Sequence, residues 1–144
     1  MNKIKKMVLM TLIAIGMVSC GESYDQVIDI ESLGNQMKYN VIEIKAKPNT
    51  KILLKFYNNA SMEIMKHNII VLNDESKVDE VGTAALKAPN NTPDHPNIIA
   101  ASDLIGPGES TELVVNIPGE PGIYPYICTF PGHYQVMRGK IIVE

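Results

Sequence analysis

The chain has 144 residues and a mass of 15.9 kDa, which is enough for one domain with a hydrophobic core. Apolar residues make up 45% of it and charged residues 20%, a balance that excludes a disordered or fibrous chain. The formal net charge is −3. It becomes −6 if residues 1–19 are removed, because they hold three of the 13 basic residues and none of the 16 acidic ones. No basic cluster remains, which argues against nucleic acid as a partner.

The first residues have the pattern of a targeting segment. Residues 1–6 are cationic, and residues 7–18 are apolar apart from Thr11 and Gly16. This apolar run is shorter than the roughly 20 residues that span a bilayer, but it matches the apolar region of a secretory signal. The sequence therefore predicts that residues 1–19 are a signal peptide and that the protein works outside the cytoplasm.

Cys20 directly follows this segment. The three residues before it, Met-Val-Ser, resemble the cleavage motif of bacterial lipoproteins, although Leu is more usual than Met at the first position. We expect a lipid on Cys20, a short tether over residues 20–25 and a folded domain over residues 26–144. The protein is then anchored to a membrane of the bacterial cell envelope and faces the periplasm. A plain signal peptide, in which Cys20 has no role, is the alternative.

Seven or eight short strands are predicted after the tether, separated by turns rich in Asn, Gly and Pro. Apolar and polar residues alternate in most of them, so that Ile52, Leu54 and Phe56, for example, share one face. Such a series is typical of an all-β, Greek-key β-sandwich. The predicted strands are residues 27–30, 37–41 with a shift of apolar phase into 42–46, 51–57, 68–72, 111–117, 122–128 and 138–143.

One partly helical insertion, residues 74–97, interrupts the strands. Val78, Val81, Ala85 and Leu86 recur at roughly helical spacing after an acidic start, which predicts a helix over residues 74–86, although Gly82 weakens this prediction. Residues 88–96 contain three prolines and two adjacent asparagines and are expected to form an irregular loop. His95 lies in this loop and is expected to be a surface histidine rather than a metal ligand.

Four side chains form the most informative pattern. Cys128, His133 and Met137 follow one another at intervals of five and four residues, and Pro131-Gly132 turns the chain between them. The loop can therefore direct three donor groups at one point, and His67 offers a second imidazole just before a predicted buried strand. One thiolate, two imidazoles and a thioether are the ligands of blue-copper electron-transfer sites.

Cys128 has other conceivable roles. Zinc accepts two imidazoles and a thiolate but gains little from a thioether, and iron–sulfur clusters need more cysteines than this chain has. A disulfide between Cys20 and Cys128 and a purely structural role for the cysteine and histidines are the remaining alternatives. Copper explains the spacing better, because an unpaired thiol outside the cytoplasm is a liability unless it is buried or metal-bound.

The segment from Cys128 to His133, followed by Met137, resembles the ligand loop of azurins, within the cupredoxins. Three further segments are also similar to azurins and follow in the same order. The resemblance covers residues 25–144 and implies a cupredoxin-like sandwich with one bound copper ion. The three further segments are residues 34–40, 65–68 and 98–109.

The resemblance implies a role for each site residue. His67, Cys128 and His133 would be equatorial copper ligands and Met137 a distant axial one, while the backbone carbonyl of Lys66 would lie on the opposite axial side. Asn68 and Thr129 would join the two ligand-bearing segments. The backbone N–H groups of Asn68 and Phe130 would donate to the Cys128 sulfur.

The resemblance also implies an apolar patch around the exposed edge of His133, where electrons enter and leave. Its members would be Met37, Met65, Phe130 and Pro131. Departures from azurins are Lys66, which stands where azurins have Gly, Ile69 in place of a buried Trp, and the absence of the azurin disulfide. The proline-rich loop around His95 also has no obvious azurin counterpart.

The favoured function is a single-electron carrier rather than an enzyme. Its negative charge favours a partner with a basic face, such as a c-type cytochrome or a membrane-bound oxidase or reductase, met through a small transient interface. A copper oxidase or nitrite reductase needs more histidines than the three in this chain. Copper delivery or sequestration without electron transfer is the alternative, although ligands on two strand ends and a tight loop favour retention of the metal.

Overall fold

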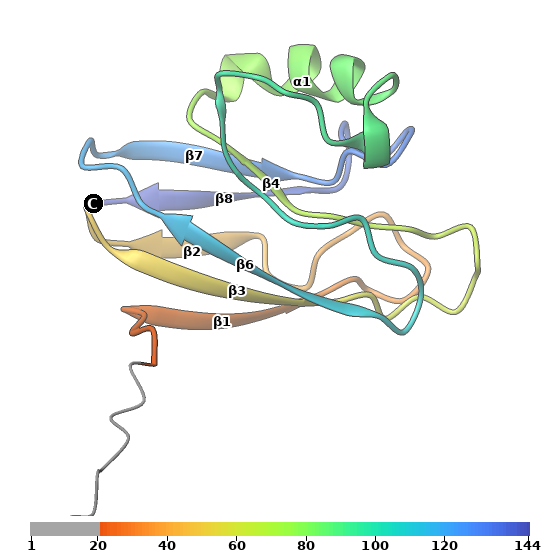
Figure 1. Cartoon of the computed structure of the whole chain (residues 1–144), viewed down its shortest axis with the longest axis horizontal. Coiled ribbons are helices and arrows are strands. Elements are labelled where there is room, and N and C mark those ends of the chain that lie inside the picture. Colours follow the sequence, from red (N-terminus) through yellow and green to blue (C-terminus); the bar gives the residue numbers. More distant parts are fainter. Residues whose placement is uncertain (1–20) are drawn as a thin grey trace, which may run out of the picture.

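The computed structural model describes residues 21–144 (Figure 1). The predicted signal peptide and Cys20 lie outside the described residues. No helix within 21–144 has the length and apolar character needed to cross a membrane.

Two β-sheets face each other, as the alternating sequence predicts (Figure 1). The chain passes between the sheets several times: its first crossing leads from β1 to β2 in the larger sheet and its second leads back to β3 in the smaller one, as in the predicted sandwich. The smaller sheet has the order β1 (Gln26–Glu31), β3 (Lys51–Tyr57), β6 (Ser110–Asn116). The larger has the order β2 (Glu43–Ala46), β8 (Arg138–Val143), β7 (Gly122–Ile127), β4 (Ile70–Leu72), β5 (Ile98–Ala101).

The main core lies between the two sheets. Ile52, Leu54 and Phe56 of β3 are buried there, as their alternation predicts. β1 and β3 are parallel, as are β2 and β8, whereas the other strand pairs are antiparallel. The three residues of β4 are all buried because this strand has neighbours on both edges and is covered on both faces.

The strand predicted over residues 37–41 is wrong. The backbone groups of this segment close a tight turn, in which Leu33 N–H donates to the Lys38 carbonyl, and only Tyr39 forms a β-bridge, with Ser32. β5 was not predicted as a strand, because it is short and only half-buried. The strands predicted at 68–72 and 122–128 are shorter in the structure, because β4 begins at Ile70 and β7 ends at Ile127. Asn68 and Cys128 therefore lie just outside the strands.

The predicted helix is confirmed as a 3₁₀ turn, η1 (Glu75–Lys77), followed by α1 (Val78–Ala85). The Asp74 side chain caps the start by accepting from the Ser76 N–H at 2.9 Å. α1 lies over the outer face of the larger sheet (Figure 1) and buries Val78 and Val81 in a second apolar cluster. Leu86 is exposed, contrary to its helical spacing, because the helix ends one residue earlier. A short 3₁₀ turn, η2 (Pro89–Asn91), lies in the irregular loop that follows.

Candidate metal centre

Three predicted ligand side chains meet at one buried point. The Cys128 sulfur lies 3.7 Å from Nδ1 of His67 and 3.6 Å from Nδ1 of His133. One ligand atom from each residue lies within 4.8 Å of the others, and within residues 21–144 no other group of three His, Cys, Asp or Glu side chains is gathered in this way. A single metal ion can therefore touch all three.

The ligand loop, residues 128–137, connects β7 to β8 and is held closed by its own backbone. Cys128 N–H donates to the Met137 carbonyl at 3.0 Å, and Met137 N–H donates to the His133 carbonyl at 2.8 Å. Gly132 has a φ of 83°, a conformation that glycine adopts without strain. The side chain of Met137 is buried in the same core cluster as Cys128. The loop thus brings the two ends of the motif together, as its spacing predicts.

His67 comes from the other side of the site and is fixed by backbone pairing. Its N–H and carbonyl exchange hydrogen bonds with Ile105 at 3.0 and 2.9 Å. The buried amide of Asn58 donates to the carbonyls of Met65 and Ile105, at 2.8 and 3.1 Å. Asn58 therefore orders the segment that leads into His67. Sequence reasoning missed it, because a single Asn at the end of a strand resembles any turn residue.

Asn68 and Thr129 join the two ligand-bearing segments. The Asn68 amide donates to the Thr129 hydroxyl at 2.8 Å, and its oxygen accepts from the Thr129 N–H at 2.8 Å. The buried Tyr39 hydroxyl donates to the Asn68 carbonyl at 2.6 Å. Tyr39 is a second supporting residue that the sequence did not reveal, because its segment was expected to be a strand.

The surroundings of Cys128 act on its sulfur in opposite directions. Burial raises the pKa of the thiol to about 12, while backbone N–H donation from Asn68 and Phe130 lowers it. Those two donors stabilise a thiolate without adding charge. The thiol alone stays protonated at neutral pH, so a bound cation must displace its proton.

Burial favours the neutral form of both imidazoles. Burial, and then the nearby His133, lower the pKa of His67 to about 4. Burial also lowers the pKa of His133. A neutral imidazole with a free lone pair is the form that binds metals. The rings lie 5.0 Å apart and Nδ1 of each faces the sulfur.

The donor set fits copper. A metal with bonds of about 2.0–2.3 Å to N and S, at the centre of a triangle, would separate sulfur from nitrogen by about 3.8 Å, close to the observed 3.6 and 3.7 Å. The Nε2 atom of His67 is buried and has no hydrogen-bond partner within the described residues. No hydrogen bond within the described part of the chain fixes the ring at Nε2, and its Nδ1 atom faces the Cys128 sulfur. Soft sulfur and imidazole donors in a nearly trigonal arrangement are those that copper prefers.

The predicted patch is only part of the exposed apolar surface. Met37 and Pro131 are exposed, Met65 and Phe130 are half-buried, and the Phe130 ring lies edge-on to His133 at 4.9 Å. His133 itself is only 4% exposed, a smaller edge than the resemblance implies. Sequence reasoning missed other exposed apolar side chains at this end of the sandwich, which are Leu33, Met62, Ile64 and Val136.

Two loops carry most of this surface. The Asn35 side chain joins them, because its oxygen accepts from the backbone N–H groups of Ser61 and Met62 at 2.9 and 3.1 Å. One loop bears Leu33 and Met37, and the other bears Met62 and Ile64 and leads into His67. Lys66, exposed, directly precedes that ligand.

His95 lies apart from the metal centre. Its Nε2 is 3.1 Å from a carboxylate oxygen of Glu80 on α1, and its Nδ1 accepts from the Asn97 N–H at 3.2 Å. Its side chain is only 11% exposed, so it is less of a surface residue than the sequence suggests. These contacts join the loop after the helix to α1 within the insertion.

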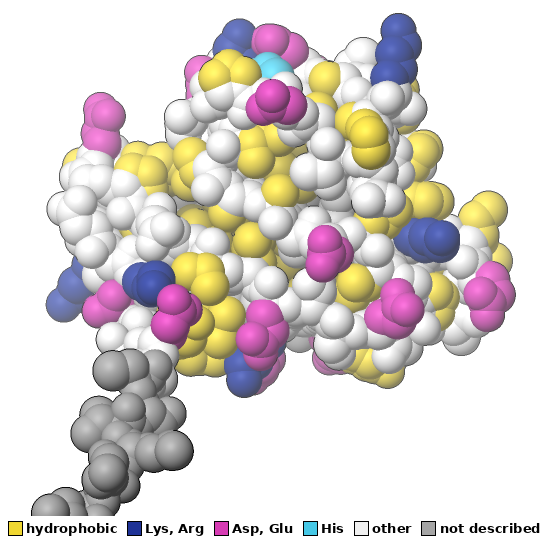
Figure 2. Space-filling view, in the orientation of Figure 1, with side chains coloured by type: hydrophobic (Ala, Val, Ile, Leu, Met, Phe, Trp, Pro, Cys, Tyr) yellow, Lys and Arg dark blue, Asp and Glu magenta, His cyan; other side chains and the backbone are white. Residues whose placement is uncertain are grey.

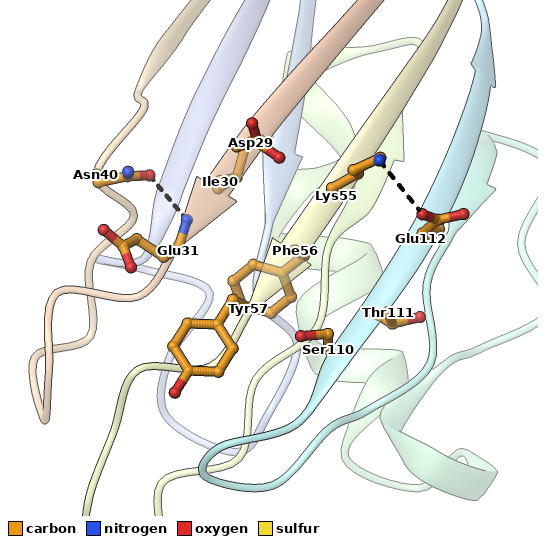
Figure 3. A pocket seen from close by; sticks show the side chains of 10 residues that line it. All are labelled: Asp29, Ile30, Glu31, Asn40, Lys55, Phe56, Tyr57, Ser110, Thr111 and Glu112. Carbon is orange, nitrogen blue, oxygen red and sulfur yellow. Dashed lines mark hydrogen bonds and ion pairs between the residues drawn. The ribbon is translucent and has the colours of Figure 1, made fainter.

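A shallow groove of about 490 Å³ lies on the outer face of the smaller sheet, away from the metal ligands (Figure 3). Lys55 pairs with Glu112 there at 3.9 Å. Acidic and basic side chains are mixed toward the left of the lower edge in Figure 2, and acidic ones alone are scattered toward its right. The groove residues are Asp29, Ile30, Glu31, Asn40, Lys55, Phe56, Tyr57, Ser110, Thr111 and Glu112.

The fold and the site together define a class of protein, a β-sandwich that holds one soft metal ion between a buried thiol and two imidazoles. A family model described as copper binding proteins, plastocyanin/azurin family, matches residues 26–144. The chain therefore belongs to the plastocyanin/azurin family of copper-binding proteins, as its ligand loop predicts.

Relatives within this family include blue copper proteins. Auracyanin-A of Chloroflexus aurantiacus is 34% identical over 122 residues, which cover 81% of this chain and 74% of that protein. The solved structure of auracyanin A, titled a "blue" copper protein, has a TM-score of 0.75 and 33% identity and covers 82% of this chain and 98% of that one. Outer membrane protein H.8 of Neisseria gonorrhoeae is 32% identical over 119 residues, which cover 78% of this chain and 64% of that protein.

Proposed function

We propose that this protein is a blue (type 1) copper protein that carries single electrons in the bacterial cell envelope. The observation that carries the proposal is the convergence of two Nδ1 atoms on the buried Cys128 sulfur, at 3.6 and 3.7 Å. Copper bound there supplies a one-electron couple between Cu(I) and Cu(II).

The side chains of His67, Cys128, His133 and Met137 would hold the copper ion, and the Lys66 carbonyl would be a further donor to it. The chain holds these groups through hydrogen bonds that do not depend on the metal, between Asn68 and Thr129 and between Cys128 and Met137. A site held in this way changes little between oxidation states, which favours fast electron exchange. Burial of the ligands also keeps water away from the metal.

Electron transfer fits the site better than catalysis does. Substrate turnover at copper needs an open coordination position or a second metal. The ligand side chains are buried, and residues 21–144 contain no second cluster of metal-binding groups. His95 is the remaining histidine of the chain, and its ring nitrogens contact the Glu80 carboxylate and the Asn97 N–H.

The partner is proposed to be another redox protein, such as a c-type cytochrome or a membrane-bound oxidase or reductase. It would dock on the exposed apolar surface formed by Leu33, Met37, Met62 and Ile64, beside Phe130 and Pro131. Apolar side chains exposed together mark interaction sites, and small interfaces suit the rapid release that redox encounters need. The net negative charge of the domain favours a partner with a basic face.

A membrane anchor is compatible with this arrangement. Cys20, the predicted lipidation site, precedes the described residues, and β1 starts at the end of the sandwich opposite the end where β7 leads into the ligand loop (Figure 1). An anchor at Cys20 would therefore leave the apolar surface free to meet a partner. Mass spectrometry of the protein purified from membranes tests the anchor, since a lipid on Cys20 adds the mass of acyl chains to the mature N-terminus.

The copper site is tested by titrating the mature domain with Cu(II) and recording visible absorption and electron paramagnetic resonance. We expect an intense thiolate-to-copper band and a narrow copper hyperfine splitting, both absent from Cys128→Ser. Colourless binding would contradict the assignment of Cys128 as a ligand.

The carrier role is tested by electron exchange with a c-type cytochrome. Ile64→Asp places a charge on the docking surface, where Ile64 is 66% exposed, and Ile123→Asp makes the same change at the start of β7, where Ile123 is 48% exposed. We expect Ile64→Asp to slow exchange about tenfold with unchanged spectra and Ile123→Asp to leave it unaltered. Slow exchange by the unchanged protein, together with rapid transfer of copper to a metal-free acceptor, would instead indicate copper delivery.

A further inference from the structure

The 74–97 insertion touches the ligand loop next to two of its ligands. One contact is made beside His133, by Tyr134, and the other beside Cys128, by Thr129. In Figure 1 the insertion runs over the larger sheet towards the end where β7 stops. The fold therefore couples the insertion to the loop, although neither contact is made by a metal ligand itself.

The first contact places the ring of Tyr134 on Gly82 of α1. A Cβ atom added at Gly82 would lie 2.3 Å from Cγ of Tyr134 and 2.5 Å from both Cδ atoms. Gly82 is helical and has no positive φ, so it is glycine because the ring occupies the space of a side chain. This explains the glycine that weakened the helix prediction. Tyr134 also packs against the apolar cluster that holds Val78 and Val81.

The second contact ties Thr129 to the loop after the helix. The Thr129 hydroxyl donates to the carbonyl of Asn91, and the same hydroxyl accepts from the Asn68 amide. Asn91 has a φ of 54°, and its side chain donates to the carbonyl of Ala85 at 3.1 Å. The carbonyl of Asn91 is thereby held against both the end of α1 and the Asn68–Thr129 pair.

We propose that the insertion is a brace for the ligand loop, in which Gly82, Tyr134 and Asn91 are positioning residues that fix the orientation of His133 and Cys128. Tyr134 is adjacent in sequence to one ligand and Thr129 to the other, so a shift of α1 is passed directly to both. The brace limits rearrangement of the ligands when the oxidation state changes. The proposal rests on the proposed copper site, and it assigns to the insertion a role in setting the properties of that site.

The test compares Gly82→Ala with Thr83→Ala, an exposed position on the same helix. Both changes raise helix propensity, but only Gly82→Ala moves the Tyr134 ring. We expect Gly82→Ala to change the copper hyperfine splitting and reduction potential and to speed amide hydrogen exchange of residues 129–137 in the metal-free protein. Thr83→Ala should match the unchanged protein in all three measurements.

A second pair of variants keeps the test decisive if Gly82→Ala does not fold. Tyr134→Ala removes the ring without overpacking, and Tyr134→Phe keeps the ring. We expect Tyr134→Ala to change the hyperfine splitting, the reduction potential and the amide exchange as Gly82→Ala does. Tyr134→Phe should change none of them. In the Tyr134→Ala background, Gly82→Ala should raise the denaturation midpoint, because the added methyl no longer meets the ring.

Normal hyperfine splitting, potential and exchange in both Gly82→Ala and Tyr134→Ala would overturn the brace while leaving the copper site intact. Failure of the unchanged protein to form the thiolate–copper band would overturn the proposed function instead. The exchange measurement on the metal-free protein separates the two, because it reports loop order without copper.

Discussion

The environment of the Cys128 thiol opposes its ionisation. Burial favours its protonated form and raises its pKa to about 12, whereas metal binding needs the thiolate. The backbone N–H groups of Asn68 and Phe130 offset part of this rise in pKa, because they donate hydrogen bonds to the sulfur. The cation that binds must therefore release one proton from the sulfur.

That proton makes copper affinity depend on pH. Burial lowers the pKa values of both imidazoles and so favours their neutral forms, which leaves the thiol as the main group that must release a proton between pH 6 and pH 8. We expect the affinity for Cu(I) to rise about tenfold per pH unit, or about 100-fold across this range. Anaerobic competition with a Cu(I) chelator of known pH dependence measures it.

Cys128→Ser is the control for this prediction. Its hydroxyl does not ionise in this range, so its much weaker affinity should be nearly independent of pH. A flat profile for the unchanged protein would show that the thiol is already ionised before copper binds.

Asn68 acts through the two hydrogen bonds that it shares with Thr129. Asn68→Ala removes both and leaves the buried Thr129 N–H without a partner, which should lower the free energy of unfolding by about 2 kcal/mol. Its own backbone N–H still donates to sulfur, so the thiolate–copper band should persist. Urea denaturation of the metal-free protein measures the change.

The matched variant is Asn73→Ala. Asn73 accepts an exposed hydrogen bond from Asn97, which is worth less than about 0.5 kcal/mol by the usual size of surface effects. Equal losses in the two variants would mean that the link between the ligand segments adds no stability.

At the scale of elements, the sequence predicted most strands and the helix because their apolar residues follow a regular period. It failed over residues 37–41, where the residues have strand character but the turn at Gly34 uses the backbone groups locally. It also missed β5, whose pairing with β4 is decided by distant parts of the chain. Gly82 shows the same limit, since only the ring of Tyr134 explains it.

The pairing of β7 with β8 depends on a glycine for space. Gly139 of β8 lies opposite Tyr126 of β7, and a Cβ atom at Gly139 would lie 2.2 Å from Cζ of that ring. Gly139→Ala should therefore lower the free energy of unfolding by about 2 kcal/mol through overpacking. Thermal unfolding followed by circular dichroism checks it.

Gly122→Ala is the comparison within the same strand pair. An added Cβ atom there would meet only Cε2 of Tyr124, at 3.8 Å, so we expect a change of less than about 0.5 kcal/mol. A neutral Gly139→Ala would mean that the Tyr126 ring moves aside freely, despite the hydrogen bond that its hydroxyl donates to Val41.

At the scale of the whole molecule, the buried imidazoles make folding sensitive to acid. His67 has an ordinary pKa of 6.5 when unfolded and about 4 when folded, so the unfolded chain binds the proton first as pH falls. Stability is therefore complete above pH 6.5 and declines towards pH 4, by about 3 kcal/mol for His67 alone. Urea denaturation of the metal-free protein at several pH values measures this decline.

His67→Gln should remove most of that slope, and the residual slope should come from His133, whose pKa is also lowered by burial. Copper should raise the stability of the folded protein but should not remove the slope, because metal binding also needs the unprotonated ligands. Constant stability of the metal-free protein from pH 7 to pH 5 would contradict the burial of a neutral His67.

The sequence by itself determined the sandwich, the helix of the insertion, the spacing that brings Cys128, His133 and Met137 together and the second imidazole of His67, because periodicity and short loops act locally. Its resemblance to azurins added the role of the Asn68–Thr129 pair. Only the tertiary structure showed Asn58 and Tyr39 beneath the site, the full extent of the exposed apolar surface, and the contact of Tyr134 with Gly82. These features join residues far apart in the chain, and their hydrogen bonds and close contacts exist only once the two sheets and the insertion have packed.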